Sequence, residues 1–595
     1  MENKDTRQFV IIGAGPAGLT AAYELLKHQV GATVLEQYDK VGGLARTENY
    51  RGYHFDMGGH RFFTKSEPVN QMWHEVLGDD FLRRPRLSRI FYQDKFFFYP
   101  LKTFNALFGL GIWQAILIVL SFIRWQIFPY KKEETFEQWV TNRFGKRLFE
   151  IFFKTYTEKV WGIPCAELKA EWAAQRIKNL SLKTALLSTI VKPGNSITTL
   201  IEEFHYPRYG PGMLWGEVKN QIEKREGKVL LNSPVTRIHR TGNRIDSVVI
   251  SQNGSGEQTI TGTDFISSMP ISEFIKKLDH VPADVLAAAQ KLRYRDFLTV
   301  CLIVNKPELF PDNWIYIHSP EVHVGRIQNF KNWSPEMVPD SSKTSLGMEY
   351  FCTEGDELWK MPDNDLIELA KRELGRIGLA KAGDVVDGCV FRVSKAYPIY
   401  DAEYAGYLKT IRDFVDGLEN LQTVGRNGLH RYNNQDHSMI TGTLAVRNLM
   451  FGEKNDLWNV NVDSEYHEEI QHQGEEKPAD SLKERITHSF PRLDPVALGF
   501  SLGATAGLWI FAATLLLVMH GGVTLEPYLA LLSNFVPGFT VTLGGSVVGM
   551  LGLFVLGFFF GSILAYLRNL AVFISARVLH RDIELYHLRR LFDFI

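Results

Sequence analysis

The residues best suited to chemistry form a glycine-rich turn near the N-terminus. Residues 9–12 have the apolar pattern of a buried strand, and residues 19–26 have the pattern of a helix. Between them lie Gly13, Gly15 and Gly18. In such a unit the first glycine makes the tight turn, the second lets the backbone approach a pyrophosphate, and the third lets the helix pack on the strand. Because the helix N-terminus offers free amides to phosphates, the segment predicts a dinucleotide site.

An acidic residue follows this turn where a nucleotide site requires one. Residues 33–35 predict a second strand, and Glu36 comes directly after it. A carboxylate at this position accepts hydrogen bonds from the ribose of the nucleotide. A strand, a glycine turn, a helix, a second strand and an acid in register are far more specific than glycines alone.

The next segments resemble those of FAD enzymes of the glutathione-reductase type, in the amine-oxidase-like branch. Gly43 and Arg46 follow Glu36, and the resemblance implies that they meet the pyrophosphate. Residues 421–428 look like the strand and glycine turn that close the FAD site late in these chains. Residues 263–270 look like the returning strand, and residues 229–236 like the strand beside the adenosine.

Over residues 8–450 the chain resembles the UDP-galactopyranose mutases and, more broadly, protoporphyrinogen-oxidase and amine-oxidase flavoproteins. The segment Tyr-Thr-Glu-Lys-Val-Trp-Gly at residues 156–162 is the most specific part of this resemblance. The other segments are residues 55–64, 92–100 and 425–436. The resemblance implies that reduced FAD attacks the anomeric carbon of a sugar through N5, so that a pyranose and a furanose interconvert.

The same resemblance assigns site residues. His60 would contact the edge of the flavin, and Trp161 would line the substrate pocket. The alternatives are that His60 caps a turn and that Trp161 belongs to the core. Arg426 and Tyr432 match residues that hold the diphosphate. Arg176 matches the first of a pair of arginines in the mutases, and Leu180 stands at the position of the second arginine. The mutase pattern is also broken at Leu429 and Asn434. Arg293 or Arg295 could supply the phosphate contact of the missing arginine.

The cofactor-binding residues predicted in this way come from the glycine turns and from the segment before a helix expected at residues 440–449. They are Gly13, Gly15, Pro16, Ala17, Gly18, Glu36, Gln37, Gly43, Leu44, Arg46, Gly58, Gly59, His60, Val235, Gly425, Arg426, Asp436, Ser438 and Met439. The amides before that helix would face the flavin N1 and O2 region, where negative charge develops. Simple helix capping is the alternative.

Composition excludes other classes of protein. The 595 residues contain 66 Lys and Arg against 67 Asp and Glu. The chain therefore lacks the excess of basic residues that is typical of nucleic-acid-binding proteins. The 4 cysteines are scattered and give neither a disulfide framework nor a cysteine zinc site. No repeated spacing of ligand residues indicates a metal site.

Charge distribution along the chain predicts a membrane anchor. Residues 495–567 contain one charged residue, Glu526, and include uncharged runs at 496–519 and 543–567, each long enough to span a bilayer. Basic residues flank both runs, which predicts a multi-pass protein of the cytoplasmic membrane with its body and both termini in the cytoplasm. Pairs of small residues spaced four apart favour helix packing and allow a homo-oligomer.

Two further segments connect these parts. Residues 104–128 are apolar with one charge, Arg124. They predict a helix in the membrane interface or a core helix, with a transmembrane span as the weakest alternative. Residues 455–494 are polar and predict a linker.

Together these features predict an α/β fold with an inserted α+β substrate domain and a C-terminal helical membrane domain. The Rossmann-like FAD-binding domain is discontinuous, comprising residues 1–90, 205–270 and 390–450. The substrate domain comprises residues 91–204 and 271–389, and residues 495–595 form the transmembrane anchor.

Three functions fit this sequence. The first is mutase-like isomerisation of a sugar on a phosphate carrier, with a polyprenyl-linked sugar suggested by the membrane anchor and NAD(P)H as a candidate electron donor. The second is oxidation or desaturation of an apolar or membrane-borne substrate, as in protoporphyrinogen oxidases. The third is a flavin-bound, non-catalytic scaffold in glycan assembly. Beyond FAD, the expected partners are the bilayer and a small-molecule or lipid-linked sugar, without nucleic acid.

Overall fold

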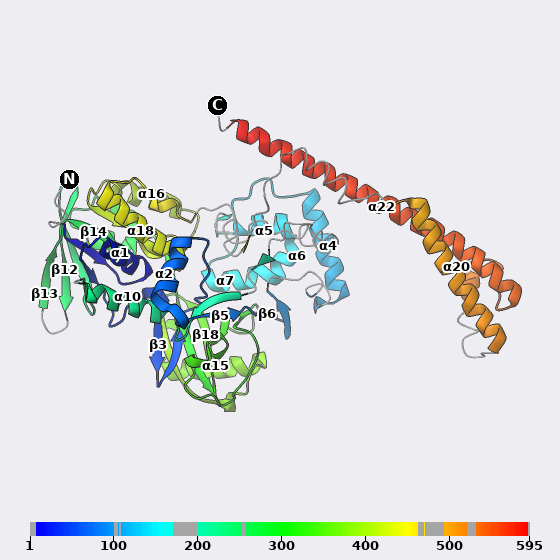
Figure 1. Ribbon diagram of the computed structural model, residues 1–595, viewed down its shortest axis with the longest axis horizontal. Helices are drawn as coiled ribbons and strands as arrows, with labels where there is room; N and C mark the ends of the chain where they lie inside the picture. Colours follow the sequence, from blue (N-terminus) through cyan, green and yellow to red (C-terminus); the bar gives the residue numbers. More distant parts are fainter. Residues whose placement is uncertain are drawn as a thin grey trace. The chain divides into compact units, whose positions relative to one another are not determined.

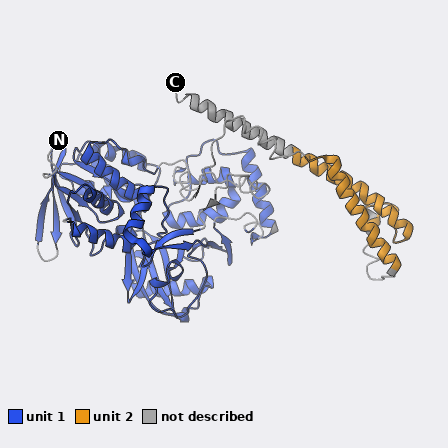
Figure 2. Ribbon diagram, in the orientation of Figure 1, with its two compact units in different colours: residues 1–472 blue, residues 473–595 orange. Residues whose placement is uncertain are grey.

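The computed structural model describes residues 7–99, 105, 109–170, 199–200, 203–225, 227–252, 256–461, 469–470, 493–520 and 531–592. The chain divides into two compact units, residues 1–472 and residues 473–595 (Figure 2). Each unit has its own architecture and its own core.

A five-stranded parallel sheet organises the nucleotide-binding half of the first unit. Its strand order is β10-β2-β1-β14-β20, with the bounds Lys228–Leu230, Ala32–Leu35, Phe9–Ile12, Asp264–Ser267 and Leu421–Thr423. Every residue of β1 and β14 is buried, as expected of parallel strands covered on both faces. Strands far apart in the sequence therefore meet in one sheet, and the predicted α/β class is confirmed.

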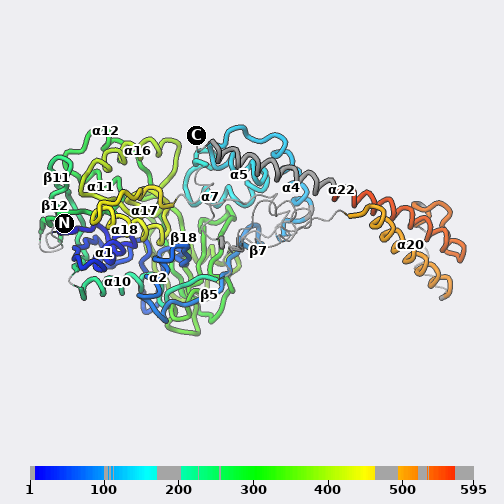
Figure 3. Tube along the Cα trace, turned by 45° about the horizontal axis from the view of Figure 1, so that its top comes forward, coloured from blue at the N-terminus to red at the C-terminus, as the bar shows by residue number. Residues whose placement is uncertain are grey.

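Helices pack around this sheet (Figure 1). They are α1 (Pro16–Lys27), α2 (Glu67–Leu77), α10 (Gly212–Lys224), α11 (Ile271–Lys277), α12 (Ala283–Lys291), α16 (Tyr404–Val415), α17 (Gly425–Gly428) and α18 (Gln435–Phe451). α1 contacts both α10 and α18, and α12 lies beside α16 (Figure 3). A three-stranded antiparallel sheet adjoins them, formed by β11 (Val235–Thr241), β12 (Arg244–Gln252) and β13 (Gly256–Thr261).

Glycines set the distances around α1. A Cβ atom on Gly18 would lie 2.0 Å from the Gly13 carbonyl oxygen, and one on Gly442 of α18 would lie 2.3 Å from the Ala17 carbonyl oxygen. Neither position has room for a side chain. Gly13 has a φ of 99°, which favours glycine, so the tight turn between β1 and α1 depends on it as predicted.

A seven-stranded mixed sheet forms the second half of this unit. Its order is β19-β15-β18-β17-β16-β6-β7, with the bounds Val385–Pro398, Tyr294–Val304, Thr344–Cys352, Arg326–Asn329, Trp314–Ile317, Ser88–Tyr92 and Lys95–Phe98. β15 is buried on both faces: Leu298 and Val300 pack with α15 (Asp363–Ile377), whereas Phe297 and Cys301 pack with the helices on the opposite face. Two-stranded pairs are β3 (Thr47–Tyr50) with β4 (Tyr53–Asp56) and β5 (Phe81–Pro85) with β9 (Glu203–Pro207).

The opposite face of this sheet carries a helical layer. It consists of α4 (Ile112–Ile127), α5 (Phe136–Phe144), α6 (Lys146–Phe149), a π-helical turn (Glu150–Lys154) and α7 (Thr155–Trp161). α4 belongs to the apolar segment 104–128. Most of its apolar side chains are exposed, so the interpretation of α4 as a core helix is wrong.

The second unit contains two long helices, α20 (Pro495–His520) and α22 (Leu543–Phe592). By length and composition, Pro495–Met519 and Leu543–Asn569 could each cross a membrane, close to the predicted bounds. The helices pack through glycines: a Cβ on Gly557 would lie 2.9 Å from the Cα of Gly503. Of the predicted linker, residues 462–468 and 471–492 lie outside the described residues. Leu457 and Trp458 pack into the core of the first unit.

Replacing Gly18 with alanine should disrupt the β1–α1 turn. The added Cβ would overlap the Gly13 carbonyl oxygen, so we expect G18A to lose roughly 1–3 kcal/mol of stability and much of its bound flavin. Thermal unfolding and the flavin absorbance of the purified protein measure both effects. Gly216 on α10 is a matched control because a Cβ there meets nothing within 4 Å, so G216A should be neutral or stabilising. Equal melting temperatures for both variants would contradict the packing argument.

Candidate functional site

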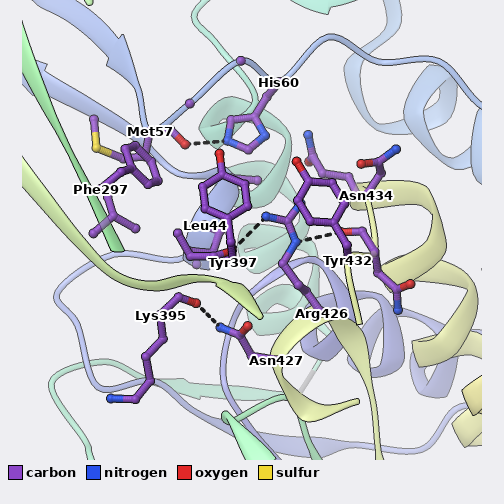
Figure 4. A pocket seen from close by; sticks show the side chains of 18 of the residues that line it. Leu44, Met57, His60, Phe297, Lys395, Tyr397, Arg426, Asn427, Tyr432 and Asn434 are labelled. Carbon is purple, nitrogen blue, oxygen red and sulfur yellow. Dashed lines mark hydrogen bonds between the residues drawn. The ribbon is translucent and has the colours of Figure 1, made fainter. Parts of the chain in front are cut away.

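A cavity of about 760 Å³ is lined by residues of both sheets and of the helical layer. It begins along the β1–α1 turn, and Figure 4 shows the part around Arg426. Four predicted catalytic residues, His60, Trp161, Arg426 and Tyr432, line this one cavity. The fifth, Arg176, lies outside the described residues.

The nucleotide end of the cavity is built from close backbone approaches. A Cβ on Gly43 would lie 3.1 Å from the Cα of Gly15, so the two glycine turns face each other. Glu36 is buried; its Oε2 accepts a hydrogen bond from the Ala14 amide at 2.8 Å, and its Oε1 accepts one from the Tyr38 amide at 3.0 Å. Burial raises the pKa of the Glu36 carboxyl, although these amides act in the opposite direction.

Most of the predicted cofactor-binding residues line the cavity. Those that do are Gly13, Gly15, Pro16, Ala17, Glu36, Gln37, Gly43, Leu44, Arg46, Gly58, Gly59, His60, Val235, Gly425, Arg426, Asp436 and Ser438. Gly18 and Met439 do not. Gly18 instead sets the helix–strand distance, and Met439 is buried in the core, where its sulfur accepts a hydrogen bond from the Trp73 indole at 3.2 Å.

The helix that closes the site begins earlier than predicted. α18 starts at Gln435 rather than Ile440, because Asn434 is its N-cap residue and the backbone N–H of Asn434 donates to Nδ1 of His437 at 3.3 Å. The segment therefore forms the first helical turn, with Asp436 and Ser438 on the cavity wall. Next to it, Oδ1 of Asn433 is buried without a hydrogen-bond partner among the described residues.

These features fit FAD. The facing glycine turns leave room for a pyrophosphate at the N-terminus of α1, and Glu36 lies where a ribose would be held. Gly59, in the turn before His60, is exposed and lines the cavity. The unpartnered Asn433 oxygen on the same cavity could accept a hydrogen bond from a flavin N–H group.

An arginine and several aromatic rings form the wall beyond the flavin region. The Arg426 guanidinium carbon lies 4.7 Å from the centroid of the Tyr432 ring and 5.7 Å from that of Tyr397 (Figure 4). Its Nε donates to the Asn433 carbonyl at 2.8 Å. Trp161 packs edge-on against Tyr397 and is almost fully buried. Arg426 is thus fixed by the backbone and by two stacked tyrosines.

His60 is neutral near pH 7. Burial lowers its pKa to about 4, and the charges of Arg426 and Arg326 act in the same direction. Its Nε2 lies 2.7 Å from the Met57 carbonyl oxygen, to which a neutral imidazole donates (Figure 4). The ring is therefore held on the cavity wall as an uncharged group.

A buried acid supports the strand before His60. Asp56, at the end of β4, accepts hydrogen bonds from the hydroxyl of Tyr206 and from Oγ1 of Thr47, the latter at 2.8 Å. Burial raises the pKa of Asp56 to about 7, and the two hydroxyl donors only partly offset this effect.

Sequence reasoning missed several cationic and phenolic groups of the cavity. The Arg61 guanidinium lies 5.0 Å from the centroid of the Trp314 ring. Arg61 directly follows His60 within residues 55–64, one of the segments that resemble the mutases. Arg326 on β17 forms a buried ion pair with Glu349; burial alone would lower its pKa, but this partner raises it well above the usual value. Arg326 and Tyr397 come from strands without a recognisable motif, so only the strand pairing brings them here.

The alternative phosphate clamps are not at the cavity. Arg295 donates to Oγ1 of Thr353 at 2.7 Å and to the Phe351 carbonyl at 3.0 Å. Arg293 is more than half exposed and lies near Asp401. Neither lines the cavity, so the suggestion that one of them replaces the missing clamp is wrong.

Comparison with known proteins agrees with this geometry. Residues 16–430 match the family described as flavin containing amine oxidoreductase. Reduced UDP-galactopyranose mutase is similar in fold, with a TM-score of 0.67 and 21% identity over 77% of this chain and 98% of that one. A protein described as a protoporphyrinogen oxidase from Exiguobacterium sp. 255-15 has a TM-score of 0.59 and 15% identity over 75% and 99%. The L-amino-acid oxidase of Crotalus adamanteus is 43% identical over 67 residues, 11% of this chain and only 13% of that protein's length.

The protonation of Asp56 should make stability pH-dependent. Its pKa is about 7 in the folded protein and about 3.9 when unfolded, so its favourable contribution is complete below about pH 4 and is lost as the pH rises through 7. D56N keeps an acceptor for Tyr206 but cannot ionise. We expect its melting temperature to fall less than that of the wild type between pH 5 and pH 8. D340N is the control, because the exposed Asp340 already has a pKa of about 2. Identical profiles for D56N and the wild type would refute the assignment.

Proposed function

This chain belongs to the family of flavin-containing amine oxidoreductases, and on that basis we propose that it isomerises a sugar carried on a lipid phosphate. Membership confirms the predicted FAD cofactor and an FAD-dependent isomerase or oxidoreductase. The observation that supports the sugar phosphate is the polar wall of the cavity: Arg61, Arg326 and Arg426 line it together with tyrosines. Arginine and phenolic hydroxyls suit a phosphate and a hydroxyl-rich ring.

Bound FAD in its reduced form supplies a nucleophilic N5 that can attack an anomeric carbon while phosphate leaves and later returns. The residues of this chain would hold the reacting groups for that exchange. Arg61 is the arginine that we propose for the phosphate, because it lines the cavity directly after His60 and its guanidinium lies 5.0 Å from the centroid of the Trp314 ring. His60, neutral at pH 7, would border the sugar without adding charge.

The membrane part of the proposal rests on the second unit. Two helices of sufficient length and apolarity follow a catalytic body, and a soluble nucleotide sugar would need no such anchor. Basic residues flank both helices and none lies between them, so we propose that the body and both ends face the cytoplasm. NAD(P)H is the proposed source of electrons for the flavin.

Oxidation of an apolar molecule is the second candidate. It is favoured by the aromatic and aliphatic residues that line the far part of the same cavity. An oxidase would bleach its oxidised flavin when its substrate is added without oxygen, whereas an isomerase would show no net redox change. This anaerobic measurement separates the two candidates.

Trapping tests the isomerase directly. Dithionite-reduced protein is incubated with polyprenyl-phosphate hexoses or with UDP-galactose, treated with cyanoborohydride, and its flavin is released for mass spectrometry. We expect the flavin mass to increase by one hexose unit with the lipid-linked donor. No mass increase with any donor, combined with anaerobic bleaching by an apolar substrate, would overturn the proposal.

A charge-neutralising variant should weaken this reaction. In R61Q the phosphate loses a charge-assisted hydrogen bond, so we expect trapping to fall by about ten- to hundredfold with flavin retained. R143Q is the matched control, since Arg143 also lies over a tryptophan, Trp139, at 3.9 Å but is not part of the cavity wall. Equal trapping by R61Q and R143Q would exclude Arg61 from phosphate binding.

A further inference from the structure

The cavity continues into an apolar arm between the seven-stranded sheet and the helical layer. The hydrocarbon and aromatic side chains that line it are Ile90, Tyr99, Ile118, Phe136, Phe144, Leu148, Phe152, Phe153 and Val160. None of these residues is charged. The arm thus differs in chemistry from the polar wall beside His60, although both belong to one continuous space.

Helix α4 covers this arm and is amphipathic, but its polar face contacts the body and much of its apolar face is exposed. Its uncharged polar side chains bond to the body: Oε1 of Gln114 accepts from Nη2 of Arg147 at 2.8 Å, and Nε2 of Gln126 donates to the Asn142 carbonyl at 2.8 Å. Oγ of Ser121 accepts from the Arg147 amide at 3.1 Å. The polar face of α4 therefore holds the helix on α5 and α6.

The apolar side of α4 is exposed. Trp113 is 76% exposed, Ile127 62% and Leu120 57%, and the exposed apolar side chains Ile116, Leu117 and Ile123 lie between them along the helix. An exposed apolar patch of this kind marks an interaction surface. Figure 1 shows α4 at the outer edge of the helical layer.

A lipid bilayer is the partner that fits this face. Arg124 on α4 and the following Lys131 and Lys132 are exposed, and aromatic and aliphatic residues beside basic ones are typical of helices that lie in the membrane interface. The same chain contains two helices able to cross a membrane, so a bilayer is available to the body without a second protein.

We propose that the outer face of α4 lies in the bilayer interface and that the arm beneath it binds the hydrocarbon chain of a lipid substrate. Ile118 links the two, because it belongs to α4 and lines the arm. A chain leaving the bilayer would cross one helix to enter the arm, with its phosphate directed toward Arg61. This inference rests on the proposed function for the nature of the headgroup, but the arm itself does not depend on it.

Photolabelling tests the arm. Full-length oxidised protein in vesicles is treated with farnesyl phosphate that has a diazirine at the end of its chain, and the labelled peptides are identified by mass spectrometry. We expect label in residues 136–160, displaced by excess farnesyl phosphate. Label confined to α20 and α22 and insensitive to this competitor would overturn the proposal.

Two variants sharpen this experiment. L148W fills the arm, so its labelling of residues 136–160 should fall by about tenfold, whereas L120W changes only the outer face of α4 and should label as the wild type does. Flavin absorbance identifies a variant that has not folded. Because no turnover is involved, failure of sugar trapping with intact labelling refutes only the proposed function, and the reverse result refutes only the arm.

Fluorescence quenching tests the membrane contact of α4. An environment-sensitive dye is attached at L120C in full-length protein within phosphatidylcholine and phosphatidylglycerol vesicles, and brominated lipids are used as quenchers. We expect quenching about threefold stronger than for the same dye at D365C on α15, with unsubstituted protein as the background for Cys389. Equal quenching at both positions would show that α4 remains in water.

Discussion

The close approach of α1 to β1 is the constraint on which the site depends. Neither Gly18 nor Gly442 has room for a Cβ, so α1 is held against its own strand on one side and against α18 on the other. The same contact brings the N-terminus of α1 to Gly43 and places the first turn of α18 on the cavity wall. Parallel strands gathered from distant parts of the sequence can then surround one cofactor.

Electrostatics divides the cavity into regions with different tasks. His60 is uncharged, Arg326 is neutralised by Glu349, and Arg426 is fixed by carbonyls and two rings. Much of the positive charge near the flavin region is therefore already balanced or structurally engaged. Arg293 and Arg295 do not line the cavity, so neither could add to the positive charge of its wall.

The nucleotide half of the site could be predicted because its chemistry is local. The turn at Gly13, the acid at Glu36 and the late turn at Gly425 are each readable within a few residues. Arg326 and Tyr397 could not be found in this way, since they reach the cavity only through the pairing of β17 and β19 with other strands. The start of α18 was misplaced because Asn434 caps the helix before its apolar pattern begins. An apolar pattern also does not show whether the apolar face of a helix packs on the protein core or on a membrane. The sequence alone therefore could not distinguish a core helix from an interfacial helix at α4.

The division into a polar wall and an apolar arm determines where selectivity must arise. Moving a hydrocarbon chain from water into the arm would release roughly 0.8 kcal/mol for each buried CH2 group, but a chain that comes from a bilayer is already out of water. Its transfer into the arm is then close to neutral, and the length of the chain contributes little to affinity. For the lipid substrate that we propose, discrimination would come from the headgroup beside the arginines and tyrosines of the polar wall, while the arm would keep the chain away from water.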